Sequence, residues 1–204
     1  MQSTMRTVIP KKIQLIPLIT LSEKLQQQVR EIRNEVNIRK WMFTDHVISK
    51  DEHKQWIQLL KQDSRQIVFA VLDDQPEVLG VVSVNAIDHL HKKAEWGIYL
   101  SETARVGLGS RLEYAIINFI FDELGMEKLN CQVIEGNDLV VRMHTKFGFQ
   151  EEGFMRSNIL KEGIRIGVHL LGLTKQEWLL GKTDLEKKYR KNFDQFDVTI
   201  RWKS

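Results

Sequence analysis

The chain has 204 residues, of which 42% are hydrophobic and 28% charged, and its formal net charge is +3 at pH 7. This length and composition predict one globular domain with a sizeable core and exclude a disordered chain. The weak positive charge is not gathered into a basic face, so we expect no nucleic-acid partner. The single cysteine, Cys131, excludes an internal disulfide and lies in a strand-like run, where a buried and unreactive thiol is expected.

The apolar runs are too short to cross a membrane. The longest, residues 115–121, is interrupted by Asn118 and falls far below the ~20 residues that a spanning helix needs. The N-terminal segment, with Lys11 and Lys12 between two prolines, lacks the apolar stretch and cleavage site of a secretory signal. We therefore expect a cytoplasmic protein without a membrane partner.

The first half of the chain contains four apolar runs typical of strands and two stretches in which apolar residues recur at helical spacing. Ser22 is expected to begin the first helix, which ends near Asn34, and a loop follows as far as Ser49. The predicted strands are 13–19, 67–72, 78–85 and 94–100, and the second predicted helix is 51–62.

The second half predicts three strands, at 128–134, 150–157 and 164–173, and helices at 109–123 and 138–146. A last helix begins at Thr174, where Thr174 and Glu177 form a capping box. The order predicts an α/β fold of a mixed sheet with helices on both faces, formed by residues 1–173, followed by a helical extension, 174–204. Residues 196–202 alternate between apolar and polar, so they could pack on this sheet or on a partner's, which leaves a homodimer open.

A glycine-containing turn follows the fourth strand and opens a helix: Arg105-Val106-Gly107-Leu108-Gly109-Ser110. The unpaired N–H groups of a helix N-terminus attract anions, and glycine lets a phosphate approach the backbone. Taken alone, the turn is equally typical of an ordinary strand-to-helix connection. It lacks the third glycine of a dinucleotide-binding fingerprint, which argues against a nicotinamide site.

An amphipathic helix from Asn137 to Lys146 follows about 30 residues later and ends at Phe147-Gly148-Phe149. In this order and spacing, the two motifs resemble the acyl-CoA site of the GCN5-related N-acetyltransferases (GNAT), over roughly residues 13–173. The resemblance implies a mostly antiparallel seven-stranded sheet, acetyl-CoA as co-substrate without a metal, and direct acetyl transfer to an amine. No suitably placed cysteine supports a covalent intermediate.

The resemblance also implies where CoA would bind. Its pantetheine would pair with Ile98, Tyr99 and Leu100, and a bulge at Trp96–Gly97 would free amides to polarise the thioester. Ala104 departs from the family's motif, which weakens one side-chain contact but not the backbone cradle. The remaining positions that match CoA contacts are Arg105, Val106, Gly107, Leu108, Gly109, Ser110, Asn137 and Lys146, the last of which could also be simply solvated.

Two residues are expected to move protons. His144 takes the position of the family's general-acid tyrosine and would protonate the CoA thiolate, or it merely packs beside CoA. Glu95 would act as the base that deprotonates the acceptor amine through water, or it is only a polar residue on a half-buried strand.

The N-terminal third resembles the sugar N-acetyltransferases of the pseudaminic acid pathway, through Arg33-Asn34, Trp41-Met42-Phe43, Ile48-Ser49 and His53. That resemblance implies a UDP-4-amino-4,6-dideoxy sugar as acceptor. Asn85 and Ala86 depart from the pattern. Arg33 could instead cap its helix, and Trp41 with Met42 could instead plug the core. The implied acceptor-binding residues are Arg33, Trp41, Met42, His53, Asn85 and Tyr99.

Two other functions fit the same motifs. A protein N-terminal acetyltransferase would have an open or acidic peptide groove, and a catalytically weak acyl-CoA-binding module would explain the missing tyrosine and Ala104. A metal site is not expected, because His89 and His91 lie in a polar hairpin without a third ligand.

Overall fold

The strands of the computed structural model, which describes residues 9–75, 77–104 and 106–202, form an eight-stranded sheet in the order β6-β7-β5-β4-β3-β2-β1-β8. Five of its seven neighbouring pairs are antiparallel, and the pairs β4–β5 and β1–β8 are parallel. The strands are β1 (Lys11–Pro17), β2 (Ile67–Asp73), β3 (Val78–Asp88), β4 (Lys93–Leu100), β5 (Lys128–Ile134), β6 (Gln150–Lys161), β7 (Ile164–Thr174) and β8 (Phe196–Ile200).

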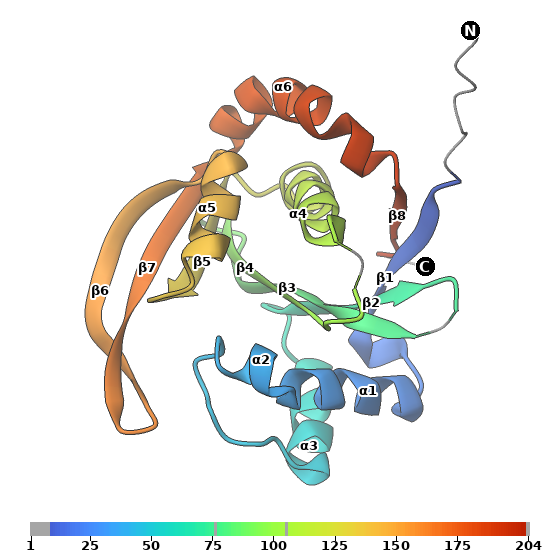
Figure 1. Ribbon diagram of the computed structural model, residues 1–204, viewed down its shortest axis with the longest axis vertical. Helices are drawn as coiled ribbons and strands as arrows, with labels where there is room; N and C mark the ends of the chain where they lie inside the picture. The colour runs from blue at the N-terminus through green and yellow to red at the C-terminus, as the bar shows by residue number, and fades with distance from the viewer. Residues whose placement is uncertain (1–8, 76, 105, 203–204) are drawn as a thin grey trace, which may run out of the picture.

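Helices cover both faces of the sheet (Figure 1). One face carries the 3-10 turn η1 (Leu18–Thr20), α1 (Glu23–Asn34), α2 (Val36–Arg39) and α3 (Lys50–Leu60). The other carries α4 (Leu108–Asn118), its π-helical continuation η2 (Phe119–Glu123) and α6 (Lys175–Phe193). Helix α5 (Asp138–Lys146) follows β5 and lies beside the β6–β7 hairpin. None of the described helices is long and apolar enough to cross a membrane.

Strand β2 shows why helices pack on both faces of the sheet. Ile67, Phe69 and Val71 pack into the core on the α4 side, whereas Val68, Ala70 and Leu72 pack into the core on the α1 side. Successive side chains of a strand point to opposite faces, so an uninterrupted apolar strand must be buried on both. The predicted α/β class and the helices on both faces are confirmed.

The predicted count of seven strands is wrong by one. Residues Phe196–Ile200 form β8, which pairs in parallel with β1, from Lys11 opposite Phe196 to Leu15 opposite Ile200. The C-terminal extension therefore contains a helix, α6, and an edge strand of the same sheet. Thr174 begins α6 with the expected capping box, because its hydroxyl accepts from the N–H of Glu177 and the Glu177 carboxylate accepts from Thr174.

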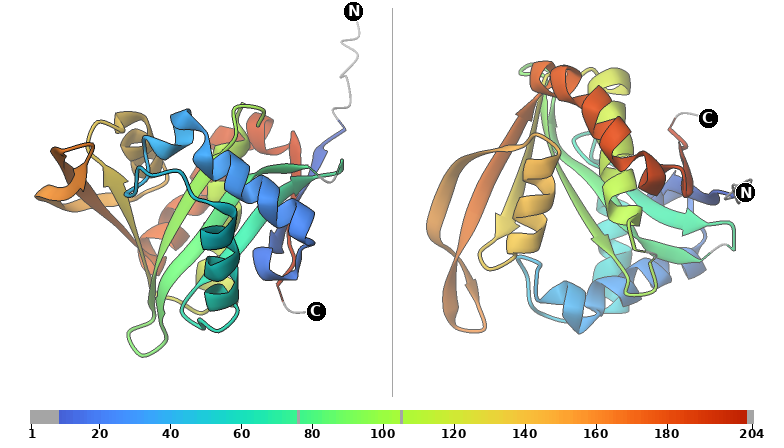
Figure 2. Two further views of the ribbon diagram at one scale, coloured as in Figure 1. Left: turned by 90° about the horizontal axis from the view of Figure 1, so that it is seen from below. Right: turned by 45° about the horizontal axis from the view of Figure 1, so that its top comes forward.

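The sheet opens between β4 and β5. These strands pair only from Lys93–Lys128 to Glu95–Asn130 and then diverge, so the β6–β7 side leans away from the rest of the sheet (Figure 2). The bulge predicted at Trp96–Gly97 is wrong, because both residues stay in regular register with β3. The irregularity lies in β3 between Asn85 and Asp88, where Ala86 has a φ of 48°. Divergence from β5, not a bulge, thus leaves this edge of β4 unpaired.

Candidate active site

A cavity of about 340 Å³ occupies the opening between β4 and β5, and we call it the wedge cavity. Glu95 and Gly97–Tyr99 line it from β4, Cys131–Ile134 from β5, and Asn137 and His144 from the start and the last turn of α5. Trp41, Met42 and Phe43 close it from the loop after α2. The structure thus brings together residues that the sequence assigned to proton transfer, CoA binding and acceptor binding.

His144 is buried at the end of the wedge cavity. Its Nδ1 lies 2.7 Å from Oε1 of Glu113, a carboxylate on α4 with 0% exposure. The imidazole also packs against the rings of Trp96 and Phe149, with centroids at 5.1 Å and 5.4 Å. Burial raises the pKa of Glu113, and the hydrogen bond with His144 opposes that rise. The ring is therefore held on three sides while it still lines the cavity.

Glu95 lies in the same cavity, on the strand edge that β5 leaves. Its Oε2 accepts from the Gln132 side chain at 3.2 Å. Burial, and then the carboxylates of Glu113 and Glu95, raise the pKa of the Cys131 thiol well above its usual range. Cys131 therefore stays protonated, as expected of an unreactive cysteine.

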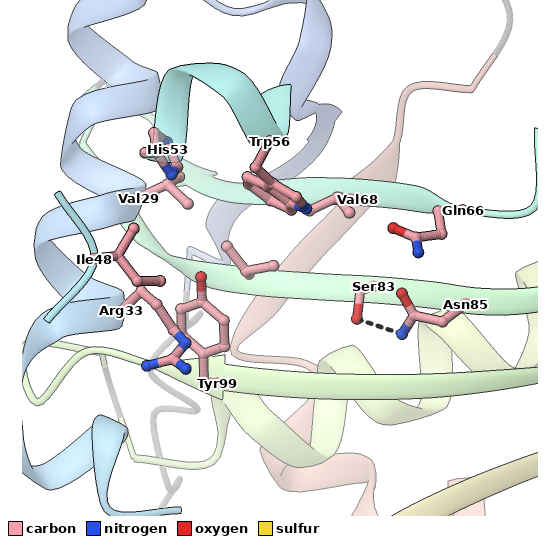
Figure 3. A pocket seen from close by; sticks show the side chains of 11 residues that line it. Val29, Arg33, Ile48, His53, Trp56, Gln66, Val68, Ser83, Asn85 and Tyr99 are labelled. Atoms are coloured by element: carbon pink, nitrogen blue, oxygen red, sulfur yellow. Dashed lines mark hydrogen bonds between the residues drawn. The ribbon is translucent and has the colours of Figure 1, made fainter. Parts of the chain in front are cut away.

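A second cavity, of about 310 Å³, lies between the sheet and helices α1 and α3 (Figure 3), and we call it the helix-side cavity. Ser83, Asn85 and Tyr99 line both cavities and form their common wall. The Asn85 amide donates to the Ser83 hydroxyl at 3.0 Å. None of the described residues that line this cavity is acidic, and its only fixed charge is the Arg33 guanidinium: Val29, Arg33, Ile48, His53, Trp56, Gln66, Val68, Val81, Ser83, Asn85 and Tyr99.

Arg33 and Tyr99 lie side by side in this cavity (Figure 3). Nη2 of Arg33 donates to the backbone oxygen and the hydroxyl of Thr44, at 3.3 Å and 2.9 Å, whereas Nη1 has no partner within the described part of the chain. Burial lowers the pKa of Arg33 and raises that of Tyr99, and each opposes the other's shift. A cation with a free donor thus faces a phenol that stays protonated.

His53 has its ring orientation fixed by the backbone. Its Nε2 lies 2.8 Å from the carbonyl oxygen of Gln26, and its ring packs against Trp56 at 5.4 Å. Burial lowers the pKa of His53. Because a carbonyl only accepts, Nε2 carries the proton, and Nδ1 of the neutral ring is left as an acceptor.

Trp41 and Met42 do not line the helix-side cavity with Arg33 and His53; they line the wedge cavity. Trp41 is 37% exposed, and Met42 is half-buried against the core on the α1 side. Lys161, at the end of β6, is buried and donates from Nζ to the carbonyl oxygens of Arg39, Lys40 and Met42, at 2.9, 2.5 and 2.7 Å. The β6–β7 hairpin therefore holds this loop in place.

The glycine turn contacts α6. Gly107 begins α4 with a φ of 91°, and a Cβ there would lie 2.5 Å from Oδ1 of Asn192. A Cβ on Gly109 would meet nothing closer than 3.7 Å, so packing within the chain does not require that glycine. Val106 is exposed, Leu108 is buried and Ser110 is half-buried, while Arg105 lies outside the described residues. Lys146 is exposed at the end of α5 and lines neither cavity.

Sequence reasoning missed Glu113, Trp56, Gln66, Ser83 and Gln132. For Glu113 a signal was present, because it falls three and four positions before Ile116 and Ile117, on the buried face of α4. Gln132 and Ser83 lie on strands next to apolar neighbours and carry no such signal. Among the described residues, no three His, Cys, Asp or Glu side chains lie together as a metal would need.

The chain was compared with known proteins. A family model described as an acetyltransferase (GNAT) domain matches residues 17–150. Acetyltransferase PseH of Campylobacter jejuni is 28% identical over 138 residues, 66% of this chain and 85% of that protein. Spermidine N(1)-acetyltransferase of Vibrio cholerae is 26% identical over 128 residues, 62% of this chain and 74% of that protein.

Among solved structures, the fold is shared by the spermidine N-acetyltransferase of Vibrio cholerae in complex with CoA and spermine. The two align with a TM-score of 0.74 at 22% identity, over 82% of this chain and 98% of that one. The stretch matched by the family model, residues 17–150, contains every described residue that lines the two cavities.

Proposed function

Since the chain belongs to the GNAT family and is an acetyl-CoA-dependent N-acetyltransferase, we propose that it acetylates the 4-amino group of a UDP-4-amino-4,6-dideoxy sugar. One observation carries this choice of acceptor. The helix-side cavity offers the Arg33 guanidinium and neutral polar groups, with no carboxylate among its described lining residues. A guanidinium with a free donor suits a diphosphate, and Ser83, Asn85 and Tyr99 suit sugar hydroxyls.

The same charge pattern disfavours a polyamine, although the chain is similar to a spermidine N(1)-acetyltransferase. A polyamine carries several positive charges and needs carboxylates to replace the water that it loses. In the helix-side cavity it would meet the half-buried Arg33 guanidinium instead. A peptide substrate has weaker support as well, because an acidic peptide groove was expected for it and none of the described residues that line this cavity is acidic.

The wedge cavity fits the thioester end of acetyl-CoA. Residues Gly97–Tyr99 line it with the strand edge that β5 does not pair, which supports an added strand-like partner such as pantetheine. The N-terminus of α4 would meet the pyrophosphate at Gly109 and Ser110. Asn137 lines the wedge cavity, so we assign it a contact with pantetheine. Lys146 is exposed at the end of α5, and we assign it a contact with an outer phosphate.

The reaction needs two proton transfers, and the wedge cavity holds a group for each. The acceptor nitrogen attacks the thioester carbonyl carbon, the C–N bond forms and the C–S bond breaks. Glu95 accepts the proton that the amine loses, directly or through water, and His144 donates a proton to the leaving thiolate. Trp41 and Met42 would cover the acceptor beside the common wall of the two cavities.

The test is thiol release from acetyl-CoA by the purified protein, with three acceptors at equal concentration: the UDP-4-amino-4,6-dideoxy sugar, spermidine, and a peptide with a free α-amino group. We expect rapid release with the nucleotide sugar only, and a product heavier by one acetyl group. Faster release with spermidine or the peptide would overturn the sugar assignment and keep the enzyme class. The sugar without its UDP should react poorly, because it lacks the diphosphate.

A further inference from the structure

Glu113 is a carboxylate buried in the core, with one partner. It lies on α4 between Leu112 and Tyr114, on the face that also buries Ile116 and Ile117. Its Oε1 contacts Nδ1 of His144, and its Oε2 has no hydrogen-bond partner within the described chain. A buried carboxylate is costly unless it is fully paired, and an apolar side chain would serve the packing of this helix face better. Packing alone therefore does not explain a glutamate here.

We propose that Glu113 is a positioning residue that turns Nε2 of His144 into the wedge cavity, so that Nε2 carries the proton which the leaving thiolate takes. This inference rests on the proposed acetyl transfer, because it assigns how the same site supplies its acid. His144 has two ring nitrogens, and Glu113 occupies Nδ1. Since His144 lines the wedge cavity, Nε2 is the nitrogen that remains for a ligand there.

Counting protons shows why the pair suits this task. With two protons between them, the residues are either a carboxylate with an imidazolium or a carboxylic acid with a neutral imidazole. In both arrangements Nε2 carries a hydrogen. After Nε2 gives its proton to the sulfur, the ring keeps the Nδ1 proton, which the carboxylate of Glu113 accepts. The pair then regains its second proton from solvent, and the proton that the acceptor nitrogen loses leaves through Glu95 or water. In sum, an amine and a thioester become an amide and a thiol.

The surroundings leave few other groups to supply this proton. Glu95 faces the wedge cavity from β4, and Cys131, whose raised thiol pKa keeps it neutral, faces it from β5. On α5 itself, Arg142 and Lys146 are exposed, and the Trp96 and Phe149 rings shield the remaining sides of the imidazole. Tyr99 also lines the cavity from β4, and burial raises the pKa of its phenol, so it stays neutral as well. The Glu113–His144 pair and Glu95 are thus the remaining described groups at this site that can exchange protons.

A double-mutant cycle with the UDP-4-amino sugar tests the proposal. Glu113→Gln keeps the shape and removes the charge, and we expect kcat to fall by about tenfold or more, with the KM for acetyl-CoA changed by less than about twofold. In a His144→Phe background, Glu113→Gln should change kcat by no more than about twofold, because Glu113 acts through His144. Ile117→Val, a packing change on the same buried helix face, should leave kcat near wild type.

The pH dependence of kcat distinguishes a positioning role of Glu113 from a packing role, because a packing role would leave it unchanged. The alkaline limb of kcat, where the pair loses its second proton, should move to lower pH in Glu113→Gln, because a neutral amide stabilises an imidazolium less than a carboxylate does. An unmoved alkaline limb, or equal losses of kcat from Glu113→Gln in both backgrounds, would overturn the proposal.

A spectroscopic experiment without any acceptor tests the role of Glu113 independently of the choice of substrate. In ¹⁵N-histidine spectra of the protein with CoA, the signal missing from His144→Phe identifies His144. At a pH above the alkaline limb, where the pair holds one proton, we expect this signal to report a neutral ring with its hydrogen on Nδ1 in the wild type, and a mixture of tautomers in Glu113→Gln. An unchanged signal would refute the positioning role. If the spectra change as expected but no acceptor gives turnover, the proposed function has failed and the pairing stands.

Discussion

The wedge cavity and the helix-side cavity share Ser83, Asn85 and Tyr99, yet they differ in the charges around them. The helix-side cavity presents a guanidinium and neutral hydrogen-bonding groups. The wedge cavity has Glu95 on one side and His144 on the other, with the buried Glu113 behind the imidazole. Under the proposed function, the helix-side cavity would bind the charged part of the acceptor and the wedge cavity would exchange protons.

The largest effect is expected at the imidazole. Replacing His144 with Phe removes the proton donor, and we expect kcat to fall by about a hundredfold while acetyl-CoA still binds. His144→Tyr differs from it by one hydroxyl and should keep more activity, because a phenol can also protonate a thiolate. Steady-state kinetics of the two variants would check this. Equal activities would show that the thiolate leaves without an acid and that His144 only packs beside the ligand.

A reversal of charge in the helix-side cavity should come next. With Arg33→Glu we expect the KM for the UDP-4-amino sugar to rise about tenfold to a hundredfold, since a charge-assisted hydrogen bond is replaced by repulsion. Arg33→Gln should lie between this variant and the wild type. Arg165→Glu makes the same charge change on the exposed part of β7 and serves as the control. If kcat falls while KM holds, the two cavities do not divide binding from chemistry as described.

The described residues of the glycine turn line neither cavity, and its two glycines test where the proposed CoA pyrophosphate lies. Gly107→Ala puts a side chain at a φ of 91° and against Asn192, and should cost about 1–3 kcal/mol of stability, measured by chemical denaturation. Gly109→Ala has room within the chain, so stability should hold. Its KM for acetyl-CoA should rise, because the methyl group would occupy the place of a phosphate oxygen. An unchanged KM would move the pyrophosphate away from this turn.

The smallest effect concerns His53 and the dependence of stability on pH. Its folded-state pKa is lowered by burial, so between that value and about 6.5 the unfolded chain binds the extra proton more readily. Stability should therefore be lost as the pH falls below about 6.5. His53→Gln can keep a donor to Gln26 without titrating, and its melting temperature should decline less on acidification. The control is His91→Gln, at an exposed histidine. If the melting temperature depends on pH identically in all three proteins, His53 does not cause the loss of stability.

The sequence predicted most of the fold because its elements carry local signals. The uninterrupted apolar run of β2 and the capping box at Thr174 are readable without any tertiary contact. The position of β8 in the sheet could not be predicted. Alternation in residues 196–202 indicates a strand but not which sheet edge it joins. The divergence of β4 from β5 was mistaken for a bulge at Gly97, because a glycine in a strand is equally compatible with both.

The predicted site residues fall into two groups in space. Glu95, Tyr99, Asn137 and His144 were predicted to transfer protons or to bind CoA and the acceptor, and all four line one cavity, because motif spacing along strands and helices carries over into three dimensions. Trp41 was expected beside Arg33 and instead faces the wedge, because a loop's path depends on distant contacts, here those of Lys161. Glu113 was not predicted as a site residue, although helical periodicity places it on the buried face of α4. Its partner His144 lies on another helix, which the spacing along α4 does not indicate.

The contacts of Lys161 also bear on how this enzyme could acquire a new substrate. One ammonium group, together with the Asp45 carboxylate that accepts from the Glu162 N–H at 2.9 Å, joins a hairpin near the C-terminal third to a loop some 120 positions earlier. The three acceptors of the ammonium are main-chain carbonyl oxygens, so a recombinant whose new loop followed a different backbone path would leave the buried Lys161 unpaired, which is costly. Drift in specificity is then expected to proceed by paired changes in the two segments, and directed evolution of this scaffold should randomise them together.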